Sequence, residues 1–246
     1  MKNTSINISG KIEPEKVSAL REINEVAKGL SIHFFVVGAF ARDVIFEHIH
    51  QISAPRMTED IDIGINVASW EEFKHLTDTL IERGLFSATN LAHRFKGISC
   101  ATVVDILPYG GISGETKHIS WPPNHDVIMS TLGFEEAFQS ALKVRFSNEP
   151  PLEILVPSVP ALALLKIISW DDAYPNRKRD AQDLLFILEQ YESTAIQKKL
   201  YESYIPLLTE EQFDSRLASV RLLGREIALL GSTETVITVV VIGKQE

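Results

Sequence analysis

The sequence predicts an α+β fold: a small mixed β-sheet with flanking helices in residues 1–156, followed by a helical region in residues 157–246. The first observation behind this is that strand-like and helix-like segments alternate up to Val156. The second is that the long segments beyond Pro157, apart from the last, have helical periodicity. The expected boundary between the two regions lies near Pro150–Pro160.

The composition is that of an ordinary globular protein, with 45% hydrophobic and 23% charged residues among 246. The net charge of -9 argues against a surface that is basic throughout, although it allows a local basic groove. Cys100 is the single cysteine, so no intrachain disulfide can form. No apolar run approaches the roughly 20 residues that a membrane span needs, and we expect a cytoplasmic protein.

Periodicity gives the elements of the first part in order. The predicted helices are Glu13–Leu30, Ala39–His48, one that begins after Ser69 and stops at Gly84, and Phe134–Val144. Ser69 and Glu72 form a capping box at the third of these. The predicted strands are Ile32–Val37, Asp60–Ile65, Ala92–Phe95, Ile98–Leu107 and Leu152–Val156, with a turn at Lys96-Gly97 and a loop over Pro108–Asn124.

The second part is expected to contain helices at Ser158–Trp170, at Asn176–Tyr191 and at about Glu210–Leu230. The final apolar segment, Val236–Ile242, is rich in β-branched residues and is predicted to be a strand. It either returns to the sheet or forms an exposed edge.

Asp60 and Asp62 stand two residues apart on a predicted strand, so their side chains point to the same face. Two adjacent carboxylates repel, and a bound divalent cation such as Mg²⁺, or Mn²⁺ in its place, removes that repulsion. Asp105 lies in an apolar strand segment and is the candidate third ligand. The alternative is that Asp60 and Asp62 are solvated on an exposed strand, because Asp-x-Asp triplets are common.

Gly38 separates the strand Ile32–Val37 from a helix that begins at Ala39. A glycine turn at a helix N-terminus offers free N–H groups to a phosphate, although an isolated glycine here is usually only a turn. The segment lacks the Gly-Lys-Ser/Thr of a Walker loop and the Gly-x-Gly-x-x-Gly of a dinucleotide site.

The combination of the Gly38 turn, the motif Arg56-x-Thr58-x-Asp60-x-Asp62 and a later strand aspartate resembles the polymerase-beta-type nucleotidyltransferases. The residues of this motif and their distance from Gly38 are most similar to those in the branch of the family that contains the AbiEii toxins of toxin–antitoxin systems. The chain departs from the family pattern at Gly38-Ala39, where Gly-Gly or Gly-Ser is common, so a serine hydroxyl able to bind phosphate is missing. The resemblance implies that Gly38, Ala39 and Thr58 lie at the nucleotide.

A second block, Leu152–Leu188, extends the resemblance. This similarity implies that Lys166 faces a phosphate. It also implies that Asp180, in the segment Arg177–Leu184, orients the Lys166 side chain. Arg42 and Arg56 are further candidates to reach phosphate or to pair with Asp43, Asp60 or Asp62. For each of these the alternative stays open: a snorkelling Lys166, a solvated helix start at Asp180, and solvated surface arginines.

The resemblance implies nucleotidyl transfer: an NMP moves from an NTP to an acceptor hydroxyl, pyrophosphate leaves, and Asp60, Asp62 and Asp105 hold the metal. The acceptor is tRNA, a protein or a small molecule such as an antibiotic, and an antitoxin protein is an expected partner of a toxin. The alternative is a degenerate member that binds nucleotide without turnover. The histidines lack zinc spacing.

Overall fold

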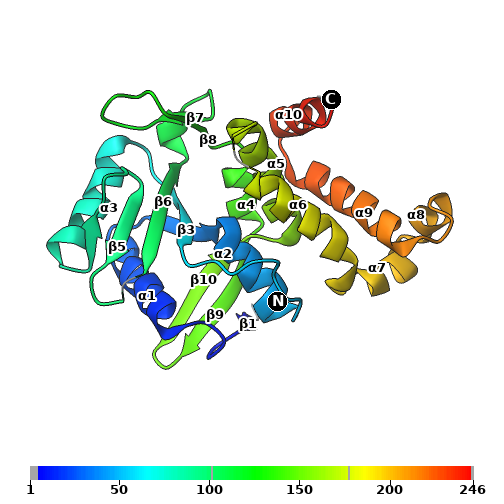
Figure 1. Ribbon diagram of the computed structural model, residues 1–246, viewed down its shortest axis with the longest axis horizontal. Helices are drawn as coiled ribbons and strands as arrows, with labels where there is room; N and C mark the ends of the chain where they lie inside the picture. Colours follow the sequence, from blue (N-terminus) through cyan, green and yellow to red (C-terminus); the bar gives the residue numbers. More distant parts are fainter. Residues whose placement is uncertain (1–4, 101, 177, 245–246) are drawn as a thin grey trace.

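A five-stranded mixed sheet forms the centre of the fold, with the strand order β2-β3-β6-β5-β4. Its strands are β2 (His33–Val37), β3 (Ile61–Asn66), β4 (Phe86–Ala88), β5 (Arg94–Gly97) and β6 (Val103–Tyr109). The pair β3 and β6 is parallel, and the other neighbours are antiparallel. Figure 1 shows this computed structural model, which describes residues 5–100, 102–176 and 178–244. Ala101 and Arg177, which fall within predicted elements, lie outside the described residues.

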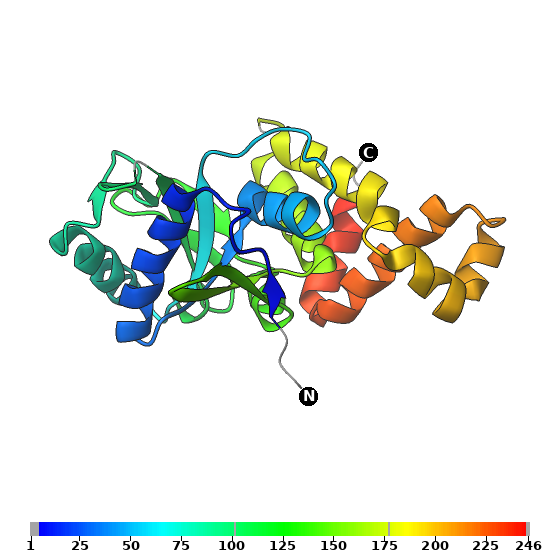
Figure 2. The same ribbon diagram turned by 90° about the horizontal axis from the view of Figure 1, so that it is seen from below.

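The two faces of the sheet are covered by different helices (Figures 1 and 2). On one face, Ile61, Ile63 and Ile65 are fully buried in a core shared with α1 (Pro14–Gly29) and α3 (Trp70–Glu82). On the other, residues of β2 and β6 pack on α4 (Phe134–Gln139) and α5 (Val159–Ala173). The alternation of Asp and Ile along β3 therefore places the carboxylates on the face of α4 and α5, as the sequence predicts.

Two smaller sheets flank the central one. The first has the order β1-β9-β10, from β1 (Ile6–Asn7), β9 (Leu142–Asn148) and β10 (Pro151–Val156). The second is the hairpin of β7 (His118–Ser120) and β8 (Ile128–Ser130). In Figure 1 this hairpin lies beyond the end of β6, beside α5.

The C-terminal part is helical, as predicted, and packs on the sheet. Its helices are α5, α6 (Arg179–Gln190), α7 (Ile196–Ser203), α8 (Ile205–Glu210), α9 (Ser215–Leu230) and α10 (Thr233–Ile242). Leu162, Ile187 and Leu223 belong to the same buried cluster as the sheet residues, whereas α7, α8 and one end of α9 enclose a small cluster of their own. Among the described residues no helix is both long and apolar enough to cross a membrane.

Two sequence predictions about elements are wrong. The segment Val236–Ile242 is not a strand but most of helix α10, which begins where the Ser232 hydroxyl accepts a hydrogen bond from the Thr235 N–H. The helix predicted over Phe134–Val144 ends at Gln139, because Leu142 onward pairs with β10 as strand β9. In both cases tertiary contacts override the local preference of the residues.

Smaller differences concern boundaries. The helix predicted over Ala39–His48 is α2 (Gly38–Asp43) continued by a π-helical turn, Val44–Ile49. Lys96-Gly97 belongs to β5, and the predicted turn falls after it. The last long helix begins at Ser215, after α7 and α8, which were not predicted. The Ser69 half of the capping box is confirmed, since the Ser69 hydroxyl accepts from the Glu72 N–H. The Glu72 carboxylate accepts from the Ala68 N–H, one residue before the predicted partner.

Candidate active site

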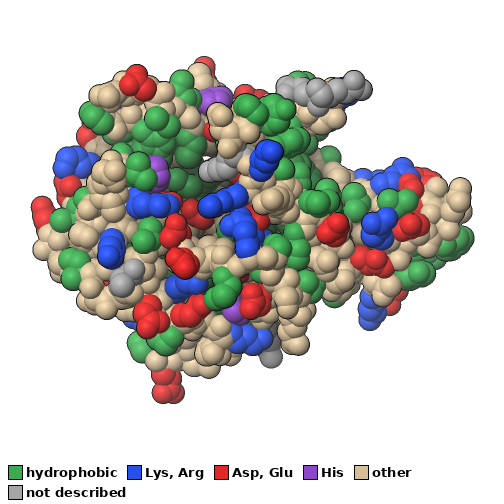
Figure 3. Space-filling view, viewed as in Figure 1, with side chains coloured by type: hydrophobic (Ala, Val, Ile, Leu, Met, Phe, Trp, Pro, Cys, Tyr) green, Lys and Arg blue, Asp and Glu red, His purple; other side chains and the backbone are tan. Residues whose placement is uncertain are grey.

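A pocket of about 800 Å³ opens on the carboxylate face of the sheet, between β3, β6, α5 and the β7–β8 hairpin. Figure 3 shows charged side chains of both signs gathered around a hollow on this side of the molecule, with hydrophobic side chains above it. The pocket brings together nine of the ten residues that the sequence nominates: Gly38, Ala39, Arg56, Thr58, Asp60, Asp62, Asp105, Lys166 and Asp180. Arg42 is the exception.

The carboxylates come from two neighbouring strands. Asp62 on β3 is the direct partner of Asp105 on the parallel strand β6, and Asp60 immediately precedes β3. Cross-strand partners on one face lie close enough for their side chains to interact. Among the described residues, however, no three His, Cys, Asp or Glu side chains are grouped so that they could hold a metal ion. An arginine, Arg94, lies between Asp60 and Asp105 in this arrangement.

Asp62 is the carboxylate whose environment most opposes its charge. Burial, followed by repulsion from Asp105 and Asp60, raises the pKa of Asp62 from 3.8 to about 6, although Lys166 and the Ala39 N–H act in the opposite direction. A bound cation would favour the ionised form. A carboxylate in a pocket with a pKa raised by burial and by neighbouring like charges is a candidate functional residue.

The raised pKa of Asp62 gives a prediction for the metal-free protein. Because the folded-state pKa exceeds the unfolded value of 3.8, stability falls as the pH rises from about 4 through about 6. We therefore expect Asp62→Asn to raise the free energy of unfolding at pH 7.5 by about 1–3 kcal/mol. Urea denaturation in EDTA at pH 7.5 and at pH 4 measures this, and the gain must disappear at pH 4.

Gly38 lies against Asp62 at the junction of β2 and α2. Its φ of +65° is in the left-handed region, and a Cβ there would stand 2.1 Å from Asp62 Oδ2. The Ala39 backbone N–H lowers the pKa of the same carboxylate. The turn therefore packs directly against Asp62, with no room for a side chain at position 38.

We expect Gly38→Ala to displace the Asp62 carboxylate from this position. Gly84→Ala is a matched control, because Gly84 has a φ of +67° but no atom within 4 Å of an added Cβ. Both variants should lose roughly 1 kcal/mol of stability through backbone strain, and only Gly38→Ala should also lose metal binding and transfer activity. Parallel denaturation and activity measurements would contradict this account if Gly84→Ala were equally inactive.

Asp183, on α6, is the centre of a buried ion-pair network beside the pocket. Its side chain is fully buried and accepts from Arg42, from Lys166 Nζ at 2.8 Å and from Arg56 Nη2 at 2.9 Å. Burial raises the pKa of Asp183, but the charges of Lys166, Arg42 and Arg56 outweigh it, so that the net pKa is lowered. The network links the helical region to the segment that leads into β3.

Lys166 projects from the otherwise apolar helix α5 and is 5% exposed. It does not reach bulk solvent, because its Nζ lies 2.8 Å from both Asp180 Oδ1 and Asp183 Oδ2. Asp180 thus contacts Lys166 directly, a contact that the expected orienting role requires. Lys166 lines the pocket near Asp62. Its positive charge partly offsets the rise in the pKa of Asp62.

Arg42 is fully buried and does not line the pocket. It pairs with Asp43 and Asp183 and donates to the Arg56 carbonyl oxygen at 2.9 Å and to the Thr58 hydroxyl at 3.3 Å. Arg42 therefore fixes the loop that carries Thr58 and leads to Asp60. This geometry assigns it a positioning role in place of the phosphate contact that the sequence suggested.

Two features of the pocket were not predicted from the sequence. Arg94 contacts the carboxylates, and its position opposite Asp105 depends on a strand register that sequence periodicity does not fix. The hairpin residues Val127, Ile128 and Met129 form an apolar wall with Trp121. Trp121 falls in the predicted loop, and the sequence predicted no element for the other three. His93 packs on Trp121 with ring centroids 5.1 Å apart.

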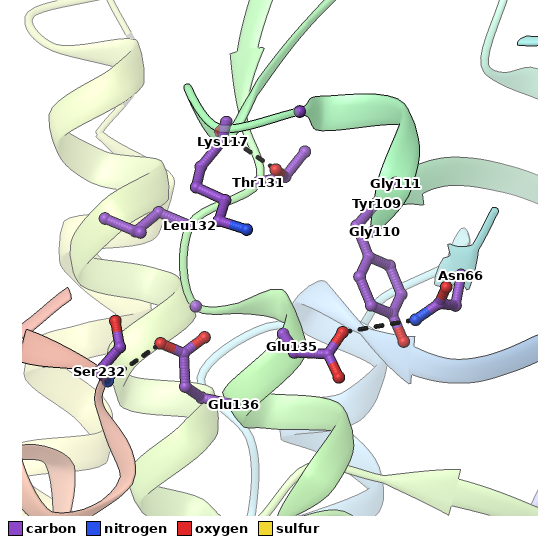
Figure 4. Close-up of a pocket in the computed structure, with 12 residues that line it drawn as sticks. Asn66, Tyr109, Gly110, Gly111, Lys117, Thr131, Leu132, Glu135, Glu136 and Ser232 are labelled. Carbon is purple, nitrogen blue, oxygen red and sulfur yellow. Dashed lines mark hydrogen bonds between the residues drawn. The ribbon is translucent and has the colours of Figure 1, made fainter. Parts of the chain in front are cut away.

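A second pocket, of about 420 Å³, lies at the other end of the same two strands (Figure 4). Asn66 and Tyr109, partners at the ends of β3 and β6, line it together with Lys117 and two glutamates of α4. The Asn66 amide donates to Glu135 at 3.4 Å, and the Ser232 N–H donates to Glu136 at 3.2 Å. It holds none of the three aspartates, so the larger pocket is the candidate active site.

The fold and this site agree with the family to which the sequence points. Residues 26–225 match the family model described as the nucleotidyl transferase AbiEii toxin of type IV toxin–antitoxin systems. The chain belongs to this family of nucleotidyltransferases. A search of curated protein sequences gives no match.

Similar solved structures include an antibiotic-resistance factor and a cyclic dinucleotide synthase. The solution structure of the antibiotic-resistance factor ANT(2'')-Ia is 13% identical, with a TM-score of 0.42, over 82% of this chain and 98% of that one. The CdnE cyclic dinucleotide synthase of Elizabethkingia meningoseptica, with GTP and Apcpp, is 14% identical, with a TM-score of 0.31, over 92% and 75%. These scores are low, and the family assignment rests on the family match.

Proposed function

We propose that the chain transfers a nucleoside monophosphate from an NTP to an acceptor hydroxyl, with Mg²⁺ or Mn²⁺ and with release of pyrophosphate. The observation that carries this is the row of carboxylates on β3 and β6, which faces a pocket whose other wall contains Lys166 and Arg56. Anionic ligands for a metal and cations for a triphosphate are both needed for this reaction and stand in one cavity.

The donor chemistry fits a divalent metal. Asp60, Asp62 and Asp105 would supply the hard oxygen ligands that Mg²⁺ prefers. The pKa of Asp62 is raised first by burial and then by the negative charges of Asp105 and Asp60, which a cation would offset. When bound, the metal would polarise the α-phosphate and favour ionisation of the acceptor hydroxyl. Asp62, which lies against Gly38, would be one of these ligands.

The remaining residues bind and orient the substrates. Lys166, held by Asp180 and Asp183, would contact the phosphates, and Arg56, whose side chain is one-third exposed, would reach them from the opposite loop. The N–H groups at Gly38 and Ala39 lie at the same end of the pocket, next to Asp62. Asp105 would accept the proton of the acceptor hydroxyl.

In the cell we propose that this activity acts in the cytosol as a toxin, controlled by an antitoxin, in keeping with the family. Expression of the chain from an inducible promoter in a bacterial host tests this. Growth should stop with the wild type, continue with Asp62→Asn at equal protein level, and resume when the neighbouring antitoxin gene is co-expressed. Arrest that persists with Asp62→Asn would separate toxicity from the proposed site.

A further inference from the structure

Arg94 stands in line with the catalytic carboxylates across three adjacent strands. Asp62 on β3 pairs with Asp105 on β6, and Asp105 pairs in turn with Arg94 on β5. Directly paired residues project to the same face of a sheet. The strand register therefore places one guanidinium at the same level as the proposed metal ligands.

The guanidinium bridges two of the carboxylates. Arg94 Nε donates to Asp105 Oδ1 at 2.8 Å, and Nη2 donates to Asp105 Oδ2 at 2.7 Å. The same Nη2 donates to Asp60 Oδ2 at 3.1 Å. A planar fork with both donors on one carboxylate is the strong geometry of an arginine–carboxylate pair.

These contacts occupy the oxygen atoms that a metal would need. Both oxygens of Asp105 are engaged, and so is one oxygen of Asp60. This agrees with the lack of a ready three-residue metal group among the described residues. The cation that offsets the charge of Asp60 and Asp105 in this structure is a side chain of the protein itself.

The side chain of Arg94 is also able to move away from Asp60 and Asp105. It is 35% exposed, against 12% for Asp105, and it reaches into the pocket from the edge of the carboxylate row. Its neighbour two positions along the strand, Lys96, lies on the same face but is exposed and outside the pocket lining. Because solvent and ligands in the pocket can reach the guanidinium, another anion can replace Asp60 and Asp105 as its partner.

We propose that Arg94 is a built-in competitor of the metal: it holds Asp60 and Asp105 in the metal-free protein and must release them before a divalent cation can bind all three carboxylates. This inference rests on the proposed function. The triphosphate is the natural alternative partner for the released guanidinium, because its oxygens match the same donor fork. The enzyme therefore takes its metal efficiently only together with the nucleotide.

Titration calorimetry with Mn²⁺ alone, without nucleotide, tests this on Arg94→Gln. We expect Arg94→Gln to bind Mn²⁺ about tenfold more tightly than the wild type, since the competing charge-assisted bonds are gone. Arg94→Lys, which keeps the charge but loses the fork, should lie between them. Lys96→Gln removes one charge from the same strand face and should bind Mn²⁺ as the wild type does.

Thermal unfolding supplies a second readout. Without metal, Arg94→Gln should melt at a lower temperature than the wild type, because Asp60 and Asp105 then repel, and Mn²⁺ should restore its stability more than that of the wild type. A residue with only a structural role would lower the melting temperature without this gain in affinity.

The outcomes separate this inference from the proposed function. If the wild type binds Mn²⁺ and Arg94→Gln binds it no more tightly, the competitor role of Arg94 is wrong while the metal site stands. If neither the wild type nor any of these variants binds Mn²⁺, even with inorganic triphosphate present, both the competitor role and the metal site are wrong.

Discussion

The double substitution Asp60→Asn with Asp62→Asn is expected to lower the rate of nucleotidyl transfer by at least about 10³-fold. Both side chains keep their shape but lose the charge that would hold the metal, and with it several kcal/mol of charge stabilisation in the transition state. The assay is the rate of pyrophosphate release with each NTP, Mg²⁺ and cell extract.

A double variant on α3, Asp78→Asn with Glu82→Gln, is the matched control. It removes two negative charges as well, but both residues lie outside the pocket. Its transfer rate should equal that of the wild type. Undiminished transfer by the Asp60→Asn, Asp62→Asn variant would show that these carboxylates are not the catalytic ligands.

Asp183→Asn should cause the largest loss of stability among single substitutions at the site, about 3–5 kcal/mol at pH 7. The change leaves the buried cations Arg42 and Lys166 without their shared anion, and Arg56 loses its partner as well. The pKa of Asp183 is lowered in the folded protein, so the difference between wild type and variant should shrink as the pH falls through and below 3.8.

Urea denaturation at neutral and acidic pH measures this effect. Asp78→Asn is the control, because it breaks an exposed pair with Lys74 and should cost less than about 1 kcal/mol. A loss for Asp183→Asn as small as that of the control would show that the three cations find other partners.

Local patterns in the sequence predicted the part of the site that depends on alternation along one strand. Asp60 and Asp62 face the pocket while Ile61 and Ile63 are buried on the other side, because side chains in a strand alternate with a period of two. Asp105 was predicted as a candidate ligand because a charged residue is unusual within an apolar strand segment unless it has a function there.

Features that depend on strand pairing and long-range contacts could not be predicted from local sequence patterns. Arg94 meets Asp105 only through the register of β5 on β6, and Arg42 meets Asp183 across 141 positions of sequence. The same limit applies to α10, whose β-branched residues predict a strand in isolation. Glu136 accepts there from the Thr235 hydroxyl, a contact that ties the start of the helix to α4.

The most direct test of the central claim is the fate of the two ends of the triphosphate. The purified protein is incubated with Mg²⁺, a cell extract and each NTP, labelled either at the α-phosphate or at the γ-phosphate. Nucleotidyl transfer predicts that the α-label becomes attached to a macromolecule or small molecule while the γ-label leaves as pyrophosphate. Attachment of the γ-label, or of neither label with any of the NTPs, would contradict the account.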